Sequence, residues 1–463
     1  MRILLIKPPT GETYKSLKSV TPEYPPLSLA YIASYLENHD FEVKILDLGV
    51  EHLDTNKLLR FVDKFSPQII GFTSTTPTII KVYSLIKMLR SEFPDIKYVL
   101  GGSHATALPE EALKYADIVI RGEGEKTFLE VVKAIKTRKQ IDNIKGISFK
   151  KNKKVFHNSD RALIANLDSI PLPAWHLLDL KKYHYFGAKR HPIASIFTSR
   201  GCPYNCSFCN KNIFSRKIRI RSNKNIMKEV DLLVNQFGVK EIHISDDVFN
   251  INKEKTIDLC KHIQKRNYDL NLFPHNGVRV SSIDKQVLDA FWDAGFYGLA
   301  FGVESGDQRI LDYNSKGIKI AEIKKAFKLT KSYDFTTWGF FILGLPGETK
   351  VSAMKTTKLA IELDPDIAKF SILVPFPGTR TYDLLKNRLK TNDWSQFGLW
   401  QKPVFEPEHM TSQELFDIYK QATRKFYFRP KKILQFTKEG LKDWNKMKEY
   451  SKAGLGLLKM TNS

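Results

Sequence analysis

Short apolar runs alternate with segments of helical periodicity through the first 140 residues. Five runs rich in isoleucine, valine and leucine have glycine, serine, threonine or proline at or just after their ends, over residues 2–6, 42–48, 68–74, 98–103 and 117–125. Between the third and fourth runs, apolar residues recur at the period of a helix with one buried face: Ile79, Val82, Tyr83, Ile86 and Leu89. Strands that alternate with helices favour an open parallel sheet. The pattern therefore predicts an α/β fold that begins with a Rossmann-like domain over residues 1–140, whose ligands would lie beyond the carboxyl ends of the strands.

The alternation stops over residues 141–185 and then resumes. This segment holds a basic strand pair around KGISFKKNKKVFHN and a stretch, IPLPAWHLLD, whose prolines prevent a continuous helix, so we expect a linker that packs on both neighbours. Six strand-and-helix units follow over residues 186–385, fewer than the eight of a complete barrel. The pattern predicts a partial (β/α)6 barrel there and a basic helical region over residues 386–463.

Composition narrows the class of protein. Lysine and arginine outnumber aspartate and glutamate by 73 to 50, which gives a formal net charge of +23. Such a charge suits nucleic acid, anionic lipid or a phosphorylated substrate, but the lysines are spread along the chain, which favours an ordinary lysine-rich surface. No apolar run is long enough to cross a bilayer, and the first run is too short for a signal peptide. We expect a cytoplasmic protein.

Three of the four cysteines lie within one stretch, TSRGCPYNCSFCN. Cys202, Cys206 and Cys209 follow the first strand of the second half, which places them on a loop at the catalytic face of the expected barrel. A disulfide is a poor explanation for an odd cluster of three thiols in a cytoplasmic chain. Three thiolates suit an iron–sulfur cluster in which one iron is left without a protein ligand.

Zinc is the alternative occupant of this loop. A structural zinc ion takes four ligands, whereas Cys260, the remaining cysteine, lies in a separate helical run. His243 and His275 are further candidates for a fourth ligand, but neither has the spacing of a zinc finger. The residue types therefore favour the iron–sulfur cluster and leave zinc as the second interpretation.

The spacing CxxxCxxC, with the aromatic Phe208 directly before the last cysteine, resembles the signature of the radical SAM superfamily. The resemblance implies that the three cysteines hold a [4Fe-4S] cluster and that S-adenosylmethionine binds its fourth iron and is cleaved to methionine and a 5′-deoxyadenosyl radical. It also implies that Phe208 packs near the adenine. Gly344 and Gly347, in FILGLPGE, would let the backbone approach the adenine closely, and a tight turn there is compatible with this role.

Acidic residues at two later strand ends are candidate contacts for S-adenosylmethionine. Asp246 and Asp247 resemble the loop of this superfamily that meets the methionyl amino group, and the alternative is a cap for the helix expected over residues 252–266. Glu304, in GVESG, would accept hydrogen bonds from ribose hydroxyls or from the methionyl ammonium. The alternative for Glu304 is an ion pair with a neighbouring lysine or with Arg279.

Motifs in the first half extend the resemblance to the cobalamin-binding radical SAM class. They are YPPLSLAYIASYL, GGSHATALPEEAL and RGEGE, and GVESG, ILGLPGE and PFPGT follow them in the second half. The glycines would leave space for the nucleotide tail of cobalamin against the sheet, and the hydroxyls would bind its ribose and phosphate. The candidate cobalamin contacts are Thr73, Ser74, Thr76, Gly101, Gly102, His104, Gly122 and Glu123.

One feature departs from other corrinoid folds. Such folds carry a cobalt-ligating histidine in DxHxxG after the first strand, whereas the corresponding loop here reads KPPTGETYKS. The resemblance then implies a cobalt whose lower face is unligated or is met by water or another side chain. For His104, its place after two glycines favours a role in stabilising the loop.

The class resemblance implies cobalamin-dependent methylation of an unactivated carbon. Radical cyclisation, oxidation or carbon–carbon coupling of a lipid or tetrapyrrole-like substrate, without methyl transfer, is the alternative. A tRNA methylthiotransferase is disfavoured because that family needs three further cysteines in its N-terminal half, and this chain has none before Cys202.

The expected partners follow from these interpretations. We expect a small-molecule or lipid substrate and an electron donor of the flavodoxin or ferredoxin type, and the retained cluster loop argues against a role confined to binding nucleic acid. The segment RKFYFRPKK is a candidate for peripheral contact with anionic lipid, or it is a helix end packed on the barrel.

Overall fold

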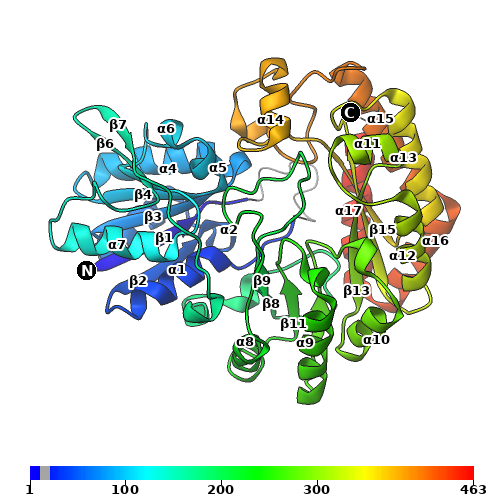
Figure 1. Ribbon diagram of the computed structural model, residues 1–463, viewed down its shortest axis with the longest axis horizontal. Helices are drawn as coiled ribbons and strands as arrows, with labels where there is room; N and C mark the ends of the chain where they lie inside the picture. Colours follow the sequence, from blue (N-terminus) through cyan, green and yellow to red (C-terminus); the bar gives the residue numbers. More distant parts are fainter. Residues whose placement is uncertain (11–20, 463) are drawn as a thin grey trace.

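The N-terminal domain is built on a parallel sheet, as predicted. The computed structural model describes residues 1–10 and 21–462. Five parallel strands lie in the order β2-β1-β3-β4-β5 (Figure 1): β1 (Arg2–Lys7), β2 (Glu42–Asp47), β3 (Ile69–Ser74), β4 (Lys97–Gly102) and β5 (Ile118–Ile120). Its longer helices are α1 (Leu27–Glu37), α3 (Thr55–Phe65), α4 (Ile79–Glu92) and α7 (Glu125–Lys136). Successive residues of β1 enter different cores, because strand side chains alternate between the two faces of a sheet.

The strand pair that the sequence assigns to a linker is the outer edge of this sheet. β6 (Ile147–Lys151) pairs antiparallel with β5, and β7 (Lys154–His157) pairs with β6. Ile147 and Phe149 are buried in the same core as α1 and α7. The hairpin covers the edge of β5, so the N-terminal domain extends beyond residue 140.

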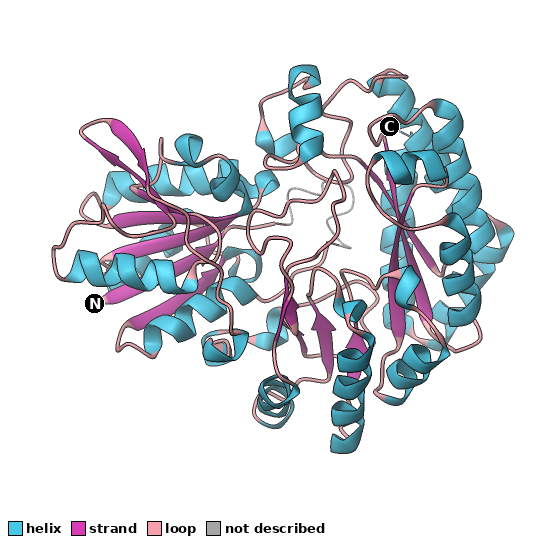
Figure 2. Ribbon diagram, viewed as in Figure 1, coloured by secondary structure: helices cyan, strands magenta, loops and turns pink. Residues whose placement is uncertain are grey.

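The second half forms the expected partial barrel of six parallel strands. They are β8 (Ile193–Ile196), β11 (Glu241–Ile244), β12 (Asn271–Phe273), β13 (Gly298–Glu304), β14 (Thr336–Leu343) and β15 (Ile367–Ile372). Two groups of three, β12-β11-β8 and β13-β14-β15, are joined by parallel bridges from Leu272 to Phe296 and from Val278 to Phe301. Figure 2 shows helices outside these strands: α8 (Asn223–Asn235), α9 (Lys253–Arg266), α10 (Lys285–Asp293), α12 (Ile320–Thr330) and α13 (Lys350–Leu363).

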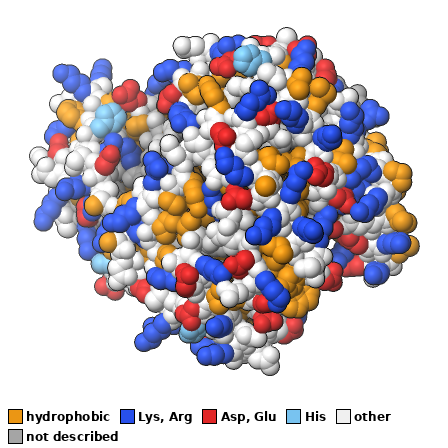
Figure 3. Space-filling model, turned by 45° about the vertical axis from the view of Figure 1, so that its right-hand side comes forward, with side chains coloured by type: hydrophobic (Ala, Val, Ile, Leu, Met, Phe, Trp, Pro, Cys, Tyr) orange, Lys and Arg blue, Asp and Glu red, His pale blue; other side chains and the backbone are white. Residues whose placement is uncertain are grey.

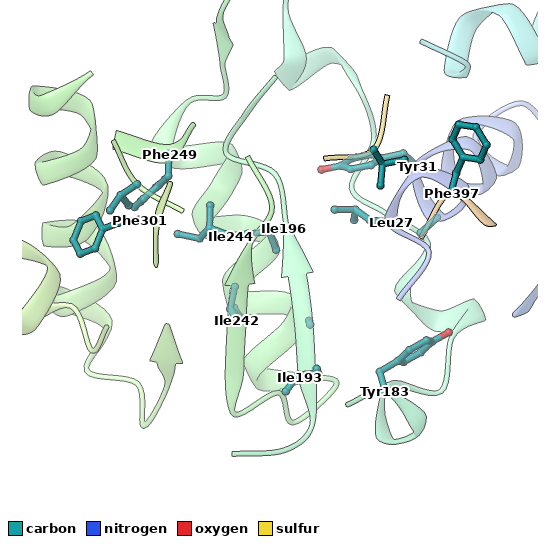
Figure 4. Close-up of a cluster of buried hydrophobic side chains, with 14 of the residues drawn as sticks. Leu27, Tyr31, Tyr183, Ile193, Ile196, Ile242, Ile244, Phe249, Phe301 and Phe397 are labelled. Carbon is teal, nitrogen blue, oxygen red and sulfur yellow. The ribbon is translucent and has the colours of Figure 1, made fainter. Parts of the chain in front are cut away.

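One hydrophobic core crosses the domain boundary. Leu27 and Tyr31 of α1 belong to the same buried cluster as Ile193 and Ile196 of β8 and as Phe301 of β13 (Figure 4). The two domains therefore share one apolar core, so packing as well as the covalent chain joins them. None of the described helices is both long enough and apolar enough to span a membrane.

The C-terminal region is only partly helical. After α14 (Arg380–Leu385), residues 386–411 run back to the N-terminal domain, where the indole Nε1 of Trp394 donates to Glu111 at 3.0 Å. Three helices then pack beside β15 (Figure 1): α15 (Ser412–Tyr427), α16 (Pro430–Lys442) and α17 (Trp444–Asn462). The expectation of a helix from residue 386 is therefore met only from residue 412.

The segment RKFYFRPKK is packed on the barrel through some of its side chains. Phe426 is fully buried, and Lys432 is buried with its ammonium donating to the carbonyl oxygen of Pro365 at 2.6 Å. These contacts are those of the helix-end alternative, while Arg424, Lys425, Phe428, Pro430 and Lys431 of the segment are exposed. Contact with anionic lipid stays a prediction. On the face shown in Figure 3, hydrophobic side chains lie in small groups between lysines and arginines.

Candidate active site at the domain boundary

The three clustered cysteines lie on a loop that faces the N-terminal domain. Residues 201–218 connect β9 (Ser199–Arg200) to β10 (Arg219–Ile220), which pair antiparallel directly after β8. Gly201 has φ +91°, and a Cβ at this position would lie 2.3 Å from the carbonyl oxygen of Lys217. Glycine is therefore required for the loop to close on itself.

Two other segments, around Asn314 and over residues 377–381, hold the middle of this loop. The amide and hydroxyl of Ser207 donate to the backbone and side-chain oxygens of Asn314 at 3.0 and 2.6 Å. The amide of Thr381 donates to the carbonyl oxygen of Ser207 at 3.0 Å, and the side-chain amide of Asn210 donates to Pro377 at 2.9 Å. Sequence reasoning missed Ser207 and Asn314, because no periodic pattern marks a polar pair more than 100 residues apart.

Two lysines, also missed, lie beside the thiols. Burial raises the pKa of Cys206 and of Cys209, while the ammonium of Lys316 acts against the shift at Cys206 and that of Lys211 against the shift at Cys209. Cations beside three thiols suit an anionic thiolate site. The described residues hold no group of three or more His, Cys, Asp or Glu side chains gathered as around a single metal ion.

The two aspartates after β11 differ in their surroundings. Asp246 is buried and accepts from the amide of Thr198 at 2.7 Å and from the hydroxyl of Ser199 at 2.6 Å, and burial raises its pKa to about 6. Asp247 is exposed and accepts from the amide of Gly201 at 3.2 Å. Asp247 is thus the more accessible of the two carboxylates and lies beside the cysteine loop. The cap alternative is wrong, because Asn252 caps α9 through the amide of Lys255.

Glu304 lies at the carboxyl end of β13 in a strained backbone conformation. Its φ is +64°, and the pairing of β13 with β14 shifts register between Gly302 and Glu304. Positive φ in a residue other than glycine is costly and is frequent at functional sites. The carboxylate of Glu304 forms an ion pair with Lys316 at 2.6 Å, as the alternative with a neighbouring lysine predicts. Arg279 does not pair with Glu304 and lies against the ring of Tyr204.

The glycines in the turn after β14 are required by the local structure. Gly344 has φ +85°, and a Cβ there would lie 2.6 Å from the side chain of Leu415 on α15, while Gly347 has φ +79°. The turn and the packing of α15 therefore require glycine whatever the turn binds. Phe208 is half-buried against the main core. The contacts of Gly344 and Phe208 with adenine remain predictions.

The strand ends of the N-terminal sheet present an open surface to the cysteine loop. A Cβ at Gly101 would have its nearest neighbour, the carbonyl oxygen of Ile120, at 3.7 Å, and one at Gly122 would have that of Asn212 at 4.0 Å. Asn212 belongs to the cysteine loop, so the two halves of the site meet here. At both glycines a Cβ would meet only ordinary van der Waals contacts, and the missing side chains let a bulky ligand such as cobalamin approach the backbone. Gly102 differs, because a Cβ there would lie 2.3 Å from the carbonyl oxygen of Ser74.

Most candidate hydroxyls and His104 are engaged within the protein. Ser74 donates to the carbonyl oxygen of Gly101 at 3.1 Å. The ring nitrogens of His104 form hydrogen bonds with Thr76 at 3.2 Å and with Glu111 at 3.4 Å, which is the loop-stabilising arrangement. Thr73 is half-buried at the end of β3. Most of the histidine-free stretch KPPTGETYKS lies outside the described residues.

Glu123 has an interdomain role in place of the expected cofactor contact. Its carboxylate accepts from Arg200 at 2.9 Å, from Arg219 at 2.8 Å and from the amide of Ile164 at 2.8 Å, and Arg200 also donates to Glu125 at 2.6 Å. The four charged side chains are only 3 to 6% exposed. A signal existed in the sequence, because buried strands rarely carry arginine without an acidic partner, and RIRS and RGEGE are complementary in charge.

Comparison with known proteins connects both halves of this site. Residues 16–132 match the family described as B12 binding domain, and residues 196–360 match the Radical SAM superfamily. The chain is 36% identical over 442 residues to an uncharacterised methyltransferase of Pyrococcus horikoshii, a match that covers 94% of each chain. It is 30% identical over 469 residues to an anaerobic magnesium-protoporphyrin IX monomethyl ester cyclase of Rubrivivax gelatinosus, with 99% of this chain and 82% of the other covered. The solved structure of the cobalamin-dependent S-adenosylmethionine radical enzyme OxsB has the same fold, with a TM-score of 0.75 at 18% identity over 99% of this chain and 71% of that one.

Proposed function

Because the chain belongs to the radical SAM superfamily and carries a B12 binding domain, we propose that it transfers a methyl group to an unactivated carbon of a small molecule. The protein is a radical SAM enzyme, and its cofactors are a [4Fe-4S] cluster, S-adenosylmethionine and cobalamin. The observation that carries the proposal is the meeting of the cysteine loop with the glycine-lined strand ends, where Asn212 lies 4.0 Å from the Cβ position of Gly122.

The residues on the two sides of this boundary have different roles. Cys202, Cys206 and Cys209 would hold the cluster, with Lys211 and Lys316 neutralising its negative charge. Asp247 is free to bind the methionyl ammonium of S-adenosylmethionine. When bound, the cluster and S-adenosylmethionine supply a carbon-centred radical that removes a hydrogen atom from the substrate, and cobalamin supplies the methyl group.

The open backbone at Gly101 and Gly122 would receive cobalamin on the opposite side. The shared apolar core below the boundary keeps the two sides in fixed register and excludes water from the space behind them. A flavodoxin- or ferredoxin-type protein would supply the electron, and the lysine-rich surface is complementary to such acidic donors.

Methyl transfer and ring formation make different products, so a labelled methyl group separates them. Anaerobically reconstituted protein is loaded with hydroxocobalamin and desalted, and we expect one cobalt beside about four irons per chain. With trideuteromethyl S-adenosylmethionine, methyl transfer adds labelled mass to the substrate. Stoichiometric cobalt with 5′-deoxyadenosine but an unlabelled, dehydrogenated product would replace methylation by cyclisation or oxidation. Four irons without cobalt would contradict the cobalamin assignment.

The cluster ligands have a matched control within the chain. Alanine at Cys206 is expected to abolish both iron loading and 5′-deoxyadenosine formation, because one of three ligands is lost. Alanine at Cys260, which is buried in α9 away from the loop, is expected to retain both. Equal loss in the two variants would overturn the assignment of the ligands.

A further inference from the structure

A large cavity lies apart from the cysteine loop, between the last barrel strands and the C-terminal helices. Its volume is about 500 Å³, within the range of sites that hold small organic molecules. Side chains of β14 and β15 form one wall, and residues of α15, α16 and α17 form the other. The lining of the cavity includes none of the residues placed at the domain boundary above.

The wall of this cavity is apolar and rich in aromatic rings. Its aromatic residues are Tyr185, Phe186, Trp338, Phe370, Trp400, Tyr419, Tyr427, Phe428, Phe436 and Tyr450. Lys369, on β15, is the one charged side chain on the wall among the described residues. An apolar enclosure of this kind excludes water and favours an apolar occupant.

Lys369 has no acidic partner in the described part of the chain. Its ammonium lies 5.6 Å from the ring centre of Phe340 and 5.0 Å from that of Trp400, and among the described residues no ion pair or hydrogen bond supplements these contacts. Burial alone lowers the pKa of Lys369 to about 8. Nearby, the Nδ1 atom of His275 is also buried without a hydrogen-bond partner among the described residues. An ammonium left without a counter-ion inside an apolar enclosure is a ready site for an anion.

The cavity reaches the surface between α15 and α16. Phe428 and Ile433 line it and are also 41% and 51% exposed, so they form its rim. Further large apolar side chains are exposed on α16 and α17: Leu434, Leu441, Trp444, Leu455 and Leu458. An apolar molecule therefore has a route from this surface to the interior.

We infer that the cavity binds the apolar body of an amphipathic carboxylic acid whose carboxylate pairs with Lys369. That this acid is the substrate rests on the proposed function. Lys369 lies on β15, and the turn after β15 holds the cysteine loop through Pro377 and Asn210. A molecule anchored at Lys369 thus lies on the strand that leads to the reaction centre.

Binding is measured by equilibrium dialysis of the full-length reconstituted protein against radiolabelled oleate, with oleyl alcohol as the uncharged counterpart. The variant Lys369→Met is expected to weaken oleate binding about tenfold or more and to change oleyl alcohol binding by less than about twofold. The matched control is Lys452→Met, an exposed lysine of α17 that does not line the cavity, and it should bind both probes as the parent protein does.

A second pair of variants tests the cavity itself. Thr423→Phe and Gly454→Phe add bulk at two lining positions, and a Cβ at Gly454 meets no atom within 4 Å, so this helix position accepts a side chain. Both are expected to weaken oleate and oleyl alcohol alike. Equal affinity of the parent protein for the two probes, or oleate binding unchanged in Lys369→Met and in both filling variants, would overturn the inference.

The same proteins separate this inference from the proposed function. Cobalt content and 5′-deoxyadenosine formation without substrate are expected to be unchanged in Lys369→Met, because Lys369 lies outside the cluster loop. Absence of a preference for oleate over oleyl alcohol in the parent protein, with intact cofactor chemistry, rejects the ligand class alone. Absent cobalt with intact oleate selectivity rejects methylation and leaves the cavity assignment in place.

Discussion

The domain junction and the C-terminal cavity differ in how their buried charges are compensated. At the junction, Arg200 and Arg219 are matched by Glu123 and Glu125, and every one of these side chains is buried. In the cavity, Lys369 lies among aromatic rings with no acid beside it in the described residues. Buried charge is tolerated only when it is compensated. The junction is compensated by the chain itself, whereas the cavity is arranged for compensation by a ligand.

The largest loss of stability is expected at the domain junction, where buried charges are paired within the protein. Arg219→Met leaves the carboxylate of Glu123 short of one of its two arginines, and breaking a buried pair costs about 3–5 kcal/mol. The free energy of unfolding in denaturant should fall by about this amount, and iron loading should fall with it because β10 carries one end of the cysteine loop. Arg216→Met, at an exposed arginine of the same loop, is the control. Equal losses in both variants would show that the buried pairing is unimportant.

An intermediate effect on stability is expected at Glu348, a buried acid that is not paired with an arginine in the described residues. Glu348 is buried after β14, its Oε1 has no partner among the described residues, and burial raises its pKa to about 8 from an ordinary value of 4.5. The folded protein therefore binds this proton more tightly than the unfolded chain. That contribution to stability is complete below pH about 4.5 and is lost as the pH rises through about 8.

Glu348→Gln removes this dependence, because the amide stays neutral. We expect the variant to exceed the parent protein in unfolding free energy by about 2–4 kcal/mol above pH 8, with a gap that closes toward pH 4.5. Chemical unfolding curves between pH 5 and pH 9 measure the gap. A constant difference at every pH would contradict the assigned protonation.

The smallest effect is expected at Lys369, where stability and binding should move in opposite directions. A lysine whose pKa is lowered to about 8 binds its proton less tightly in the folded state than in the unfolded chain. Its charge therefore costs stability below pH 8, and the cost fades as the pH rises toward 10.5, the ordinary value. Without ligand, Lys369→Met should be more stable at pH 7 by roughly 1–2 kcal/mol in denaturant unfolding. A loss of stability would mean that Lys369 is already compensated.

Much of the fold follows from the sequence because parallel strands are covered on both faces. Such strands read as continuous apolar runs, so the five strands of the first sheet and the six of the barrel are visible along the chain. The lysines of β6 and β7 favour a linker, and only the pairing of β6 with β5, at three successive residues from Ile118 to Ile120, places the two strands in the sheet. Residues 386–411 have no periodicity, and their course is set by contacts with a distant domain.

The candidate site likewise has parts that the sequence predicts and parts that it does not. Cysteine spacing is local, so the ligand loop is visible in the sequence. Lys211 belongs to the same loop, whereas the position of Lys316 beside Cys206 depends on how two separate loops meet, which no local pattern marks. Glu123 was interpreted as a cofactor contact because its motif was considered alone. Its partners, Arg200 and Arg219, lie 77 and 96 residues further along the chain.

The contact between Trp394 and Glu111 has a consequence for biosynthesis. The two residues are separated by 283 positions, and Trp394 also packs edge-on against His104 at 5.1 Å. A ribosome has therefore released the whole N-terminal sheet, and then the barrel strands, before the residue that covers this surface is made. Until then Glu111 and His104 lack their indole partner, so the N-terminal domain reaches its final form among the last events of translation.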